Sequence, residues 1–168
     1  MKPIYYVDCD GVMIDSDTRL SIMKKKAGFI EHTKESYYKY FEYAEKHLEE
    51  WDYIIKEANQ INKSIDIIKE YEKLKKIIIL TKIHSLYEMN LKYDILRNKW
   101  NIKSDIIFVP PYSSKSEIVD PKGNKLVDDL EENIIKWNED GGEGILFDSK
   151  IKENSKNKIK NLKLFFEN

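Results

Sequence analysis

Five short apolar runs, none of which alternates with polar residues, constrain the fold of this chain most. They lie within residues 4–7, 76–80, 105–109, 125–127 and 144–147. An unbroken apolar run of this length is typical of a strand buried on both faces of a parallel sheet. Segments with helical periodicity separate most of the runs, as in repeated βα units. The pattern predicts an α/β fold with a doubly wound, Rossmann-like parallel sheet of about five strands.

The interval between the first two runs is longer than one crossover helix requires. Residues 15–63 have helix-forming sequence without a strand pattern, and Gly28 is placed to end the first helix there. Ser64 is predicted to be the N-cap of the helix that returns to the core. We therefore expect a core of residues 1–14 and 64–168, with a small helical cap inserted after the first strand. A cap at this position can close over the strand end and exclude water.

The composition narrows the class of protein. The 168 residues include 29 basic and 30 acidic side chains, a balance that indicates neither nucleic acid nor a membrane surface as partner. No apolar run is long enough to span a bilayer, and strand-like sequence begins by Pro3, which leaves no room for a signal peptide. The single cysteine, Cys9, excludes an internal disulfide and is expected to lie in the core. We therefore expect a cytoplasmic protein.

Two acids and a glycine follow the first apolar run, as Asp8, Asp10 and Gly11. Residues two apart in a strand point to the same side, so both carboxylates emerge where the strand ends, and glycine permits a sharp turn. Such oxygen ligands suit a hard divalent cation, and a carboxylate beside the cation can attack phosphorus. A plain turn is the alternative. A calcium loop would need a third ligand and a glycine where Val12 and Met13 stand.

Three later strand ends carry polar residues of complementary chemistry. Thr81 ends the second run, Lys115 follows the third, and Asp128 and Asp129 end the fourth. Because ligands of open α/β sheets bind at the carboxyl ends of the strands, these residues should meet the acids of the first strand at one edge. There the hydroxyl can hold a phosphoryl oxygen, the ammonium can neutralise developing charge, and the acids can hold a metal.

With these motifs in this order, the chain resembles the haloacid dehalogenase (HAD) superfamily of phosphohydrolases. The matching segments are Asp8-Cys9-Asp10-Gly11-Val12, Leu80-Thr81, Lys115 and Leu126-Val127-Asp128-Asp129. The resemblance extends over nearly the whole chain, and the insertion after the first motif is similar to that superfamily's C1-type cap. Within the superfamily, the chain is most similar to the branch of 5'-nucleotidases, including those that act on deoxyribonucleotides.

Two details depart from that branch. The residues after Thr81 do not follow the Thr-Ser-Pro that nucleotidases of the branch often carry. Lys122 and Lys125 are further candidates for the third motif. Lys115 is preferred because the serines around it resemble a helix start, whereas Lys122 lies in a turn and Lys125 enters a strand.

The resemblance implies a magnesium-dependent phosphomonoesterase that works through an aspartyl-phosphate intermediate. Asp8 would attack phosphorus, while Asp10 would protonate the leaving oxygen and then activate water. Thr81 and Lys115 would hold the transferring phosphoryl group.

Mg²⁺ is the implied cofactor. It would be held by Asp8, the main-chain carbonyl of Asp10 and Asp129, with Asp128 close by. Clustered carboxylates are unfavourable without a cation, which argues against the rival from another class, a non-catalytic module that binds a nucleotide or a partner protein. A 3'-phosphatase acting on nucleic-acid ends is a second enzymatic alternative, and the balanced charge disfavours it.

The implied substrate is a small phosphomonoester, with a nucleoside 5'-monophosphate preferred over a sugar phosphate. A cap of about fifty residues leaves room for a compact ligand but would obstruct a folded protein substrate. Tyr37, Tyr40, Phe41 and Trp51 are the aromatic candidates for stacking on a base, although an aromatic stripe on a helix more often serves packing. The base, and the choice between ribose and deoxyribose, stay open.

Overall fold

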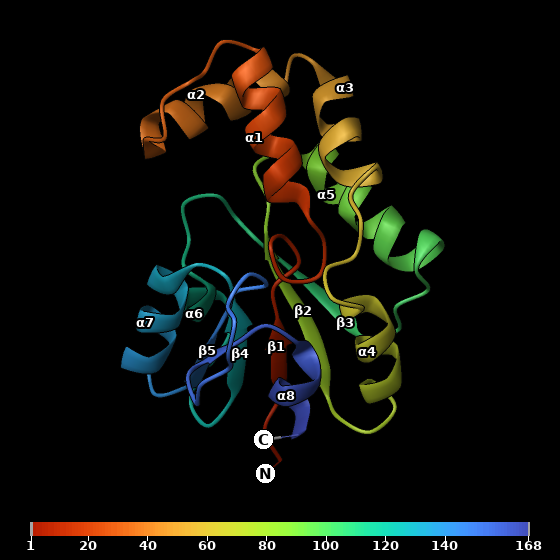
Figure 1. The fold of residues 1–168 in the computed structure, drawn as a ribbon, viewed down its shortest axis with the longest axis vertical. Coiled ribbons are helices and arrows are strands. Elements are labelled where there is room, and N and C mark those ends of the chain that lie inside the picture. The colour runs from red at the N-terminus through yellow and green to blue at the C-terminus, as the bar shows by residue number, and fades with distance from the viewer. Residues whose placement is uncertain (1, 168) are drawn as a thin grey trace.

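The computed structural model describes residues 2–167. In this range six parallel strands form one sheet, in the order β3-β2-β1-β4-β5-β6 (Figure 1). They are β1 (Tyr5–Val7), β2 (Ile77–Lys82), β3 (Asp105–Val109), β4 (Lys125–Asp128), β5 (Glu143–Phe147) and β6 (Lys158–Ile159). The chain winds outward from β1 to β3 on one side and from β4 to β6 on the other. The doubly wound parallel sheet is confirmed, with six strands among the described residues where about five were predicted.

Helices cover the sheet and carry the crossovers between its strands. In the core they are α4 (Ser64–Tyr71), α5 (Leu86–Asp94) continued by the π-helix η2 (Ile95–Lys99), α6 (Lys115–Ile118), α7 (Glu131–Glu139) and α8 (Leu162–Glu167). The predicted N-cap role of Ser64 is wrong, because the N-cap position of α4 is Lys63. The Ser64 hydroxyl instead donates to the main-chain oxygen of Met13 at 2.7 Å. This hydrogen bond ties the start of α4 to the loop that follows β1.

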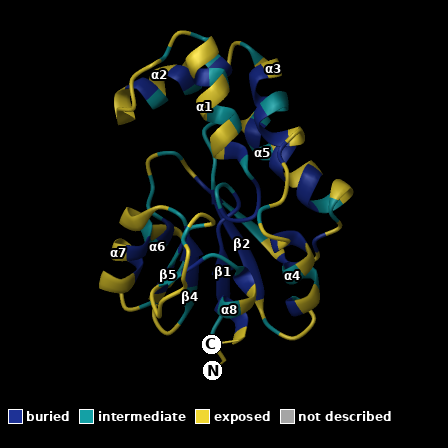
Figure 2. Cartoon of the chain, in the orientation of Figure 1, coloured by how far each residue is buried: buried dark blue, intermediate teal, exposed yellow. Residues whose placement is uncertain are grey.

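The apolar runs are unbroken because each strand packs on both of its faces. Along β1, Tyr5 and Val7 belong to one core cluster, in which the Tyr5 ring meets Phe165 of α8 at a centroid distance of 5.4 Å. Tyr6 points to the opposite face and meets Trp137 of α7 at 5.3 Å. Figure 2 shows the central strands in dark blue, the colour of buried residues. A strand in this position needs apolar side chains at successive positions.

The C-terminal segment differs from its sequence pattern. The lysine-rich residues 150–163 predict a last helix buried through Ile159, Leu162 and Phe166, but the helix begins only at Leu162. Before it the chain runs beside β5 as β6, and the N–H of Asp148 donates to the Ile159 oxygen at 2.8 Å. All three apolar side chains are buried. A short strand followed by a short helix satisfies the same spacing of buried residues as one longer helix.

Residues 15–63, which we refer to as the cap, form a helical layer beyond the carboxyl ends of the strands (Figure 1). The cap helices are α1 (Ser16–Lys26), α2 (Lys34–Ala44), α3 (Leu48–Trp51) and the π-helix η1 (Asp52–Lys56). Gly28, with φ of +89°, follows the end of α1, where the sequence predicts a stop. The chain enters and leaves the cap at one place, because Ile14 and Gln60 form an antiparallel bridge.

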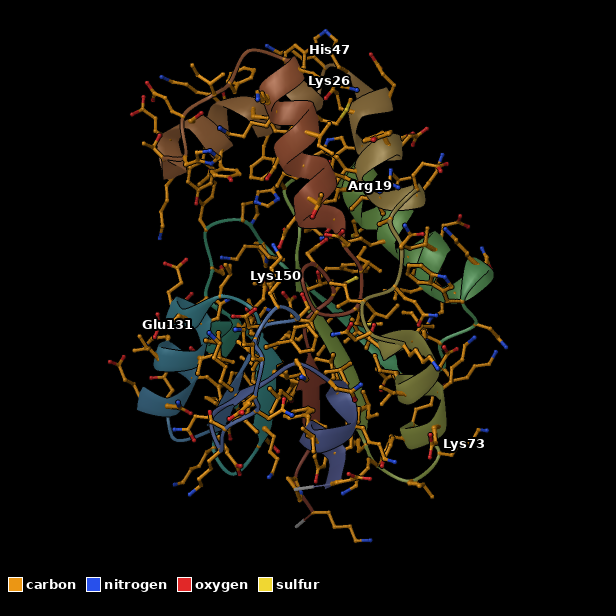
Figure 3. All side chains as sticks on the ribbon, in the orientation of Figure 1. Arg19, Lys26, His47, Lys73, Glu131 and Lys150 are labelled. Carbon is orange, nitrogen blue, oxygen red and sulfur yellow. The ribbon has the colours of Figure 1, made fainter. Side chains whose placement is uncertain are left out.

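Charged side chains project from the outer surface of both parts. Lys26 on the cap and Lys73 on the core are both exposed and point away from the molecule (Figure 3). Across residues 2–167, the helices fall short of the length and apolar character needed to cross a membrane. The buried apolar side chains lie in the sheet, in the helices that cover it and in the cap, and most of them belong to one cluster.

Candidate functional site

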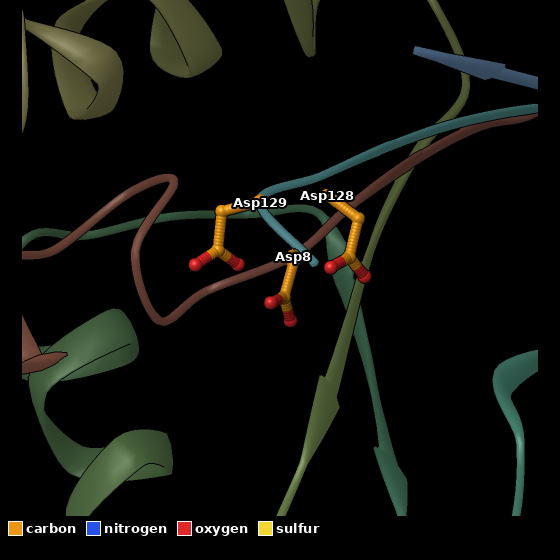
Figure 4. A group of neighbouring side chains, drawn as sticks. All are labelled: Asp8, Asp128 and Asp129. Atoms are coloured by element: carbon orange, nitrogen blue, oxygen red, sulfur yellow. The ribbon is translucent and has the colours of Figure 1, made fainter. Parts of the chain in front are cut away.

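Three carboxylates converge where the strand order reverses, between the carboxyl ends of β1 and β4. Val7 pairs with Val127 across these strands, so Asp8 and Asp128 lie side by side, and Asp129 follows. Ligand-capable oxygens of the three acids all lie within 4.8 Å of one another (Figure 4). In open α/β sheets this reversal point opens the crevice in which ligands bind. The acids predicted from two separate motifs therefore come together in one small volume.

Lys115 lies between two of these carboxylates. Its side chain is 3% exposed, and Nζ is 2.7 Å from Asp8 Oδ1 and 2.5 Å from Asp128 Oδ2. Burial lowers the pKa of Lys115, but the two carboxylates raise it by more, so the ammonium stays charged. Lys115 is the first residue of α6, directly after Ser114, whose N–H donates to the Glu117 carboxylate at 2.7 Å. The helix start that the serines predict is thus present, and it directs the lysine into the acidic cluster.

The two acids at the end of β4 have different surroundings. Asp128 is fully buried, and its carboxylate accepts from the Asn133 amide at 3.0 Å, from the Leu130 N–H at 2.9 Å and from the lysine ammonium. Asp129 is only partly buried, and its carboxyl group shares a hydrogen bond with Asp17 of α1. The oxygens of Asp128 are therefore all engaged by donors within the protein, whereas Asp129 lines an open cavity.

Burial and crowding raise the pKa values of the acids. Burial, Asp8 and Asp17 together raise the pKa of Asp129 to about 10. Burial raises the pKa of Asp8 to about 7, although Lys115 opposes it. Burial and Asp10 raise the pKa of Asp17 to about 6. A divalent cation would remove this repulsion, and clustered carboxylate oxygens are the ligands that Mg²⁺ takes, so the residues fit the implied cofactor.

Asp10 is held between the cap and the core. Ser16, at the start of α1, donates from Oγ to Asp10 Oδ1 at 2.6 Å. On the other side, Asp10 Oδ2 accepts from Thr81 Oγ1 at 3.3 Å and lies 2.5 Å from Nζ of Lys92. Thr81 and Lys92 are both buried. The hydroxyl predicted at the end of β2 thus reaches the site beside the second acid of the first motif.

Sequence reasoning missed Lys92, Glu88 and Asp17 as residues of this site. His84, Glu88 and Lys92 follow one another at intervals of four, the spacing at which helical side chains face one another, and this spacing is the signal that could have found them. Asp17 lies in the first turn of α1, where an acid is common because it favours the helix N-terminus. Its sequence position therefore carried no distinctive signal.

A cavity of about 190 Å³ separates the cap from the carboxylate cluster. The cap contributes its apolar wall, formed by Leu20, Phe41, Trp51, Ile54 and Ile55. Two of the four aromatic candidates, Phe41 and Trp51, therefore reach the site. Tyr40 points elsewhere, since its hydroxyl donates to Glu50 within the cap at 2.7 Å. Tyr37 lies beneath a lysine ammonium of α1, at 4.6 Å from the ring centroid.

Gly11 turns the chain beside Asp129, and a side chain at this position would displace that carboxylate. Gly11 has φ of +67°, and an added Cβ would lie 2.3 Å from Asp129 Oδ2 and 2.7 Å from Asp17 Oδ2. We expect Gly11→Ala to cost about 1 kcal/mol of unfolding free energy through its positive φ. We also expect magnesium affinity to fall by about 10–100-fold, because Asp129, a predicted ligand, is pushed aside. Urea unfolding in EDTA and calorimetric titration with Mg²⁺ measure the two effects.

Gly123→Ala is the matched control. Gly123 has nearly the same backbone conformation, with φ of +71°, but nothing lies within 4 Å of an added Cβ. This variant should therefore lose a similar amount of stability and keep its magnesium affinity. Equal magnesium affinity in the two variants would contradict the placement of Asp129 at the metal.

No protein-family model and no curated protein sequence matches the chain. Solved structures do match it. The HAD hydrolase YfnB of Bacillus subtilis, bound to magnesium, superposes with a TM-score of 0.63 at 13% identity, covering 99% of this chain and 97% of that one. A subfamily IA HAD hydrolase of Geobacter sulfurreducens gives 0.63 at 12% identity, covering 99% of both chains. The D,D-heptose bisphosphate phosphatase of B. bronchiseptica, complexed with magnesium and phosphate, gives 0.52 at 14% identity, covering 88% of this chain and 80% of that one.

Sequence identities of 12–14% establish likeness of fold and not of chemistry. Both of the first two alignments cover 99% of this chain. The chain therefore has the Rossmann-like α/β fold of the haloacid dehalogenase superfamily of hydrolases.

Proposed function

We propose that this chain is a magnesium-dependent phosphomonoesterase that works through an aspartyl-phosphate intermediate. The observation that carries the proposal is the convergence of a candidate nucleophile, Asp8, with a buried cation, Lys115, and further acids at one edge of the sheet. Phosphoryl transfer depends on positioning and on charge compensation around the transferring group, which this arrangement offers. A phosphatase with magnesium and phosphate bound shares the fold, and this supports the choice of phosphoryl chemistry.

In the first step, an Asp8 oxygen attacks phosphorus as the bond from phosphorus to the leaving oxygen breaks, and Asp10 gives that oxygen a proton. Lys115 has two carboxylate partners for three N–H groups, so one donor remains for a phosphoryl oxygen. Thr81 offers its hydroxyl to the same group. In the second step, Asp10 takes a proton from water as the water oxygen attacks phosphorus, which releases phosphate and restores Asp8.

Asp8, Asp129 and the main-chain carbonyl of Asp10 would hold Mg²⁺. When bound, the ion compensates negative charge on the phosphoryl oxygens. We assign Asp128 a different role, because its carboxylate is already committed to Lys115 and to two further donors. Asp128 would fix the lysine ammonium beside Asp8, so that both stay in place while phosphate is transferred.

The proposed substrate is a small phosphomonoester, with a nucleoside 5'-monophosphate as the first candidate. Phe41 stacks on His84 at a centroid distance of 3.7 Å and on Trp51 at 5.7 Å, and this aromatic wall of the cavity suits a base. The cavity, at about 190 Å³, is smaller than the roughly 300–1,000 Å³ of usual ligand pockets, which favours a compact ligand. Because a sugar phosphate is also compact, it is the second candidate substrate. In either case residues 15–63 would act as the cap on a core of residues 1–14 and 64–168.

A phosphate-release screen tests the proposed function. The purified protein would be assayed with Mg²⁺ against ribo- and deoxyribonucleoside 5'-monophosphates, sugar phosphates, p-nitrophenyl phosphate and a 3'-phosphorylated oligonucleotide. Turnover of nucleotides supports the proposal. Turnover of sugar phosphates alone would show that the nucleotide assignment is wrong and that the phosphomonoesterase assignment holds. Preference for the oligonucleotide would indicate a 3'-phosphatase. Tight nucleotide or protein binding without phosphate release would indicate a non-catalytic module.

Without metal, stability should fall as the pH rises from about 5 to about 8. Since the pKa values of Asp8 and Asp129 are raised to about 7 and about 10, the folded state keeps protons that the unfolded chain has released. Each such group contributes stability at low pH that is lost as the pH rises through its folded-state pKa, by up to about 1.4 kcal/mol per pH unit. Urea unfolding in EDTA across this pH range measures the slope.

Magnesium should flatten this dependence, because a cation compensates the carboxylates that protons otherwise neutralise. Its stabilising effect should therefore be larger at about pH 8 than at about pH 5, and it should grow with concentration as for any ligand of the folded state. Asp129→Asn is the matched variant: it should show a shallower slope in EDTA and little response to Mg²⁺. A metal-free stability that rises with pH over this range would contradict the repulsion within the cluster.

A further inference from the structure

Lys92 is a buried cation that the steps above do not use. It lies on α5, and its side chain is 1% exposed. Its Nζ is 2.5 Å from Asp10 Oδ2, 2.6 Å from Glu88 Oε1 and 2.7 Å from the main-chain oxygen of Lys82. Thr81 Oγ1 lies 3.3 Å away. Lys92 therefore reaches from a helix of the core to the side chain that transfers protons in the proposed reaction.

The donors of Lys92 are fully used by the protein. An ammonium has three N–H groups, and Lys92 has three acceptors within 2.7 Å. Lys115 differs, since it has two such acceptors, both of them carboxylates of the acidic cluster. Lys115 thus keeps a donor for a phosphoryl oxygen, whereas Lys92 directs its charge at Asp10.

Glu88 compensates the charge of Lys92 and is itself held in place. Its carboxylate accepts from the main-chain N–H of His84 at 2.6 Å. Burial raises the pKa of Glu88, but Lys92 and His84 lower it by more, to about 2, so Glu88 stays ionised. A buried ion pair gives little net stability compared with apolar residues of the same volume. Stability alone therefore explains this pair poorly, whereas a fixed position for Asp10 explains it directly.

We propose that Lys92 is a positioning residue that holds Asp10 for proton transfer to the leaving group. Lys92 fixes Asp10 Oδ2 from the core side, and Ser16 fixes Oδ1 from the cap side at 2.6 Å. Asp10 itself lines the cavity, so its carboxyl group is kept beside the space for the substrate. This inference rests on the proposed phosphatase function and deepens it, because it assigns the geometry of the acid–base step to α5.

The leaving group distinguishes this role from others. An alkyl phosphate releases a basic alkoxide that needs the proton from Asp10, whereas p-nitrophenolate leaves without one. Loss of positioning should therefore lower kcat/KM for alkyl phosphates and spare p-nitrophenyl phosphate. Loss of a structural contact, or of a contact to the phosphoryl group, would lower kcat/KM for alkyl phosphates and for p-nitrophenyl phosphate alike.

The test compares kcat/KM for p-nitrophenyl phosphate with kcat/KM for the nucleoside or sugar phosphate that the wild type turns over fastest. The double variant Glu88→Gln, Lys92→Met removes one charge of each sign and so keeps the charge balance. We expect it to lose at least about 10²-fold with the alkyl phosphate and less than about threefold with p-nitrophenyl phosphate. Lys92→Arg keeps the cation with another geometry, and should lose about tenfold with the alkyl phosphate only.

Lys99→Met is the matched control. Lys99 follows on η2 and donates to the main-chain oxygen of Lys56 at 2.7 Å, away from the site, so both substrates should keep their kcat/KM. Equal losses with both substrates, or no loss, in the double variant would overturn the role of Lys92. Should the double variant not fold, the same comparison is decided by Lys92→Arg. If the wild type hydrolyses none of the phosphates, the proposed function and this inference are both overturned. If the wild type is active but the Lys92 variants lose equal activity with both substrates, the inference alone is overturned.

Discussion

Replacement of Asp8 by Asn is expected to lower kcat by at least about 10⁴-fold with every phosphomonoester, because an amide cannot form the covalent phosphoryl intermediate. The loss should include p-nitrophenyl phosphate, since a good leaving group does not replace a nucleophile. Phosphate release under saturating substrate and Mg²⁺ measures it. Undiminished turnover in this variant would end the aspartyl-phosphate mechanism.

Two further measurements separate this chemical effect from unfolding. Asp8→Asn removes one negative charge from a crowded, buried cluster, so its stability in EDTA near neutral pH should equal or exceed that of the wild type. Asp105→Asn is the control substitution, at the exposed amino end of β3 on the opposite edge of the sheet. Its activity should match that of the wild type.

Lys115→Met is expected to have the largest effect on stability, a loss of about 3–5 kcal/mol of unfolding free energy. The side chain is 3% exposed and bridges Asp8 and Asp128, so its removal leaves two buried carboxylates without their cation. Since a typical domain is stable by only about 5–15 kcal/mol, part of the variant should be unfolded at physiological temperature. Urea unfolding in the presence and absence of Mg²⁺ measures the loss.

Lys136→Met serves as the comparison for Lys115→Met. Lys136 also pairs with an acid, Asp140 at 3.0 Å, but on the exposed face of α7 where water screens the charges. Its removal should leave stability almost unchanged. If the two variants were equally stable, the buried triad of Asp8, Lys115 and Asp128 would not be holding the site together.

The sheet could be predicted because its strands depend on local sequence. Runs such as 76–80 are apolar at successive positions, since both faces of the strand are covered, and this pattern is visible without a structure. β6 gives no such pattern. Its two residues, Lys158 and Ile159, form a strand only because they lie beside β5, and such pairing depends on the folded arrangement of distant segments.

The site could be predicted in part for the same reason. Asp8 and Asp129 follow strand ends, and topology brings strand ends to one edge. Lys92 lies in the middle of a helix, where a lysine is common, and the contact of its side chain with Asp10 depends on how α5 packs against α3 and η1 of the cap. The orientation of the aromatic residues depends on packing within the cap, which is why Phe41 lines the cavity and Tyr40, one residue earlier, does not.

The cap is joined to the core at one place, where its two ends lie side by side, and this allows insertions of different length to evolve there. Ile14 and Gln60 are paired, and the N–H of Asp15 donates to the oxygen of Asn59 at 2.9 Å, so the two ends of the inserted segment are already side by side. Because the entropy of closing a loop grows only slowly with its length, segments of very different size can be grafted between these ends at similar cost. An inserted segment must present apolar side chains to the core, because Trp51, Ile54 and Ile55 of the cap belong to one hydrophobic cluster with core residues. Within that condition, exchange of this one contiguous segment would change the residues that line the cavity, while the carboxylate cluster and the sheet that carries it stay the same.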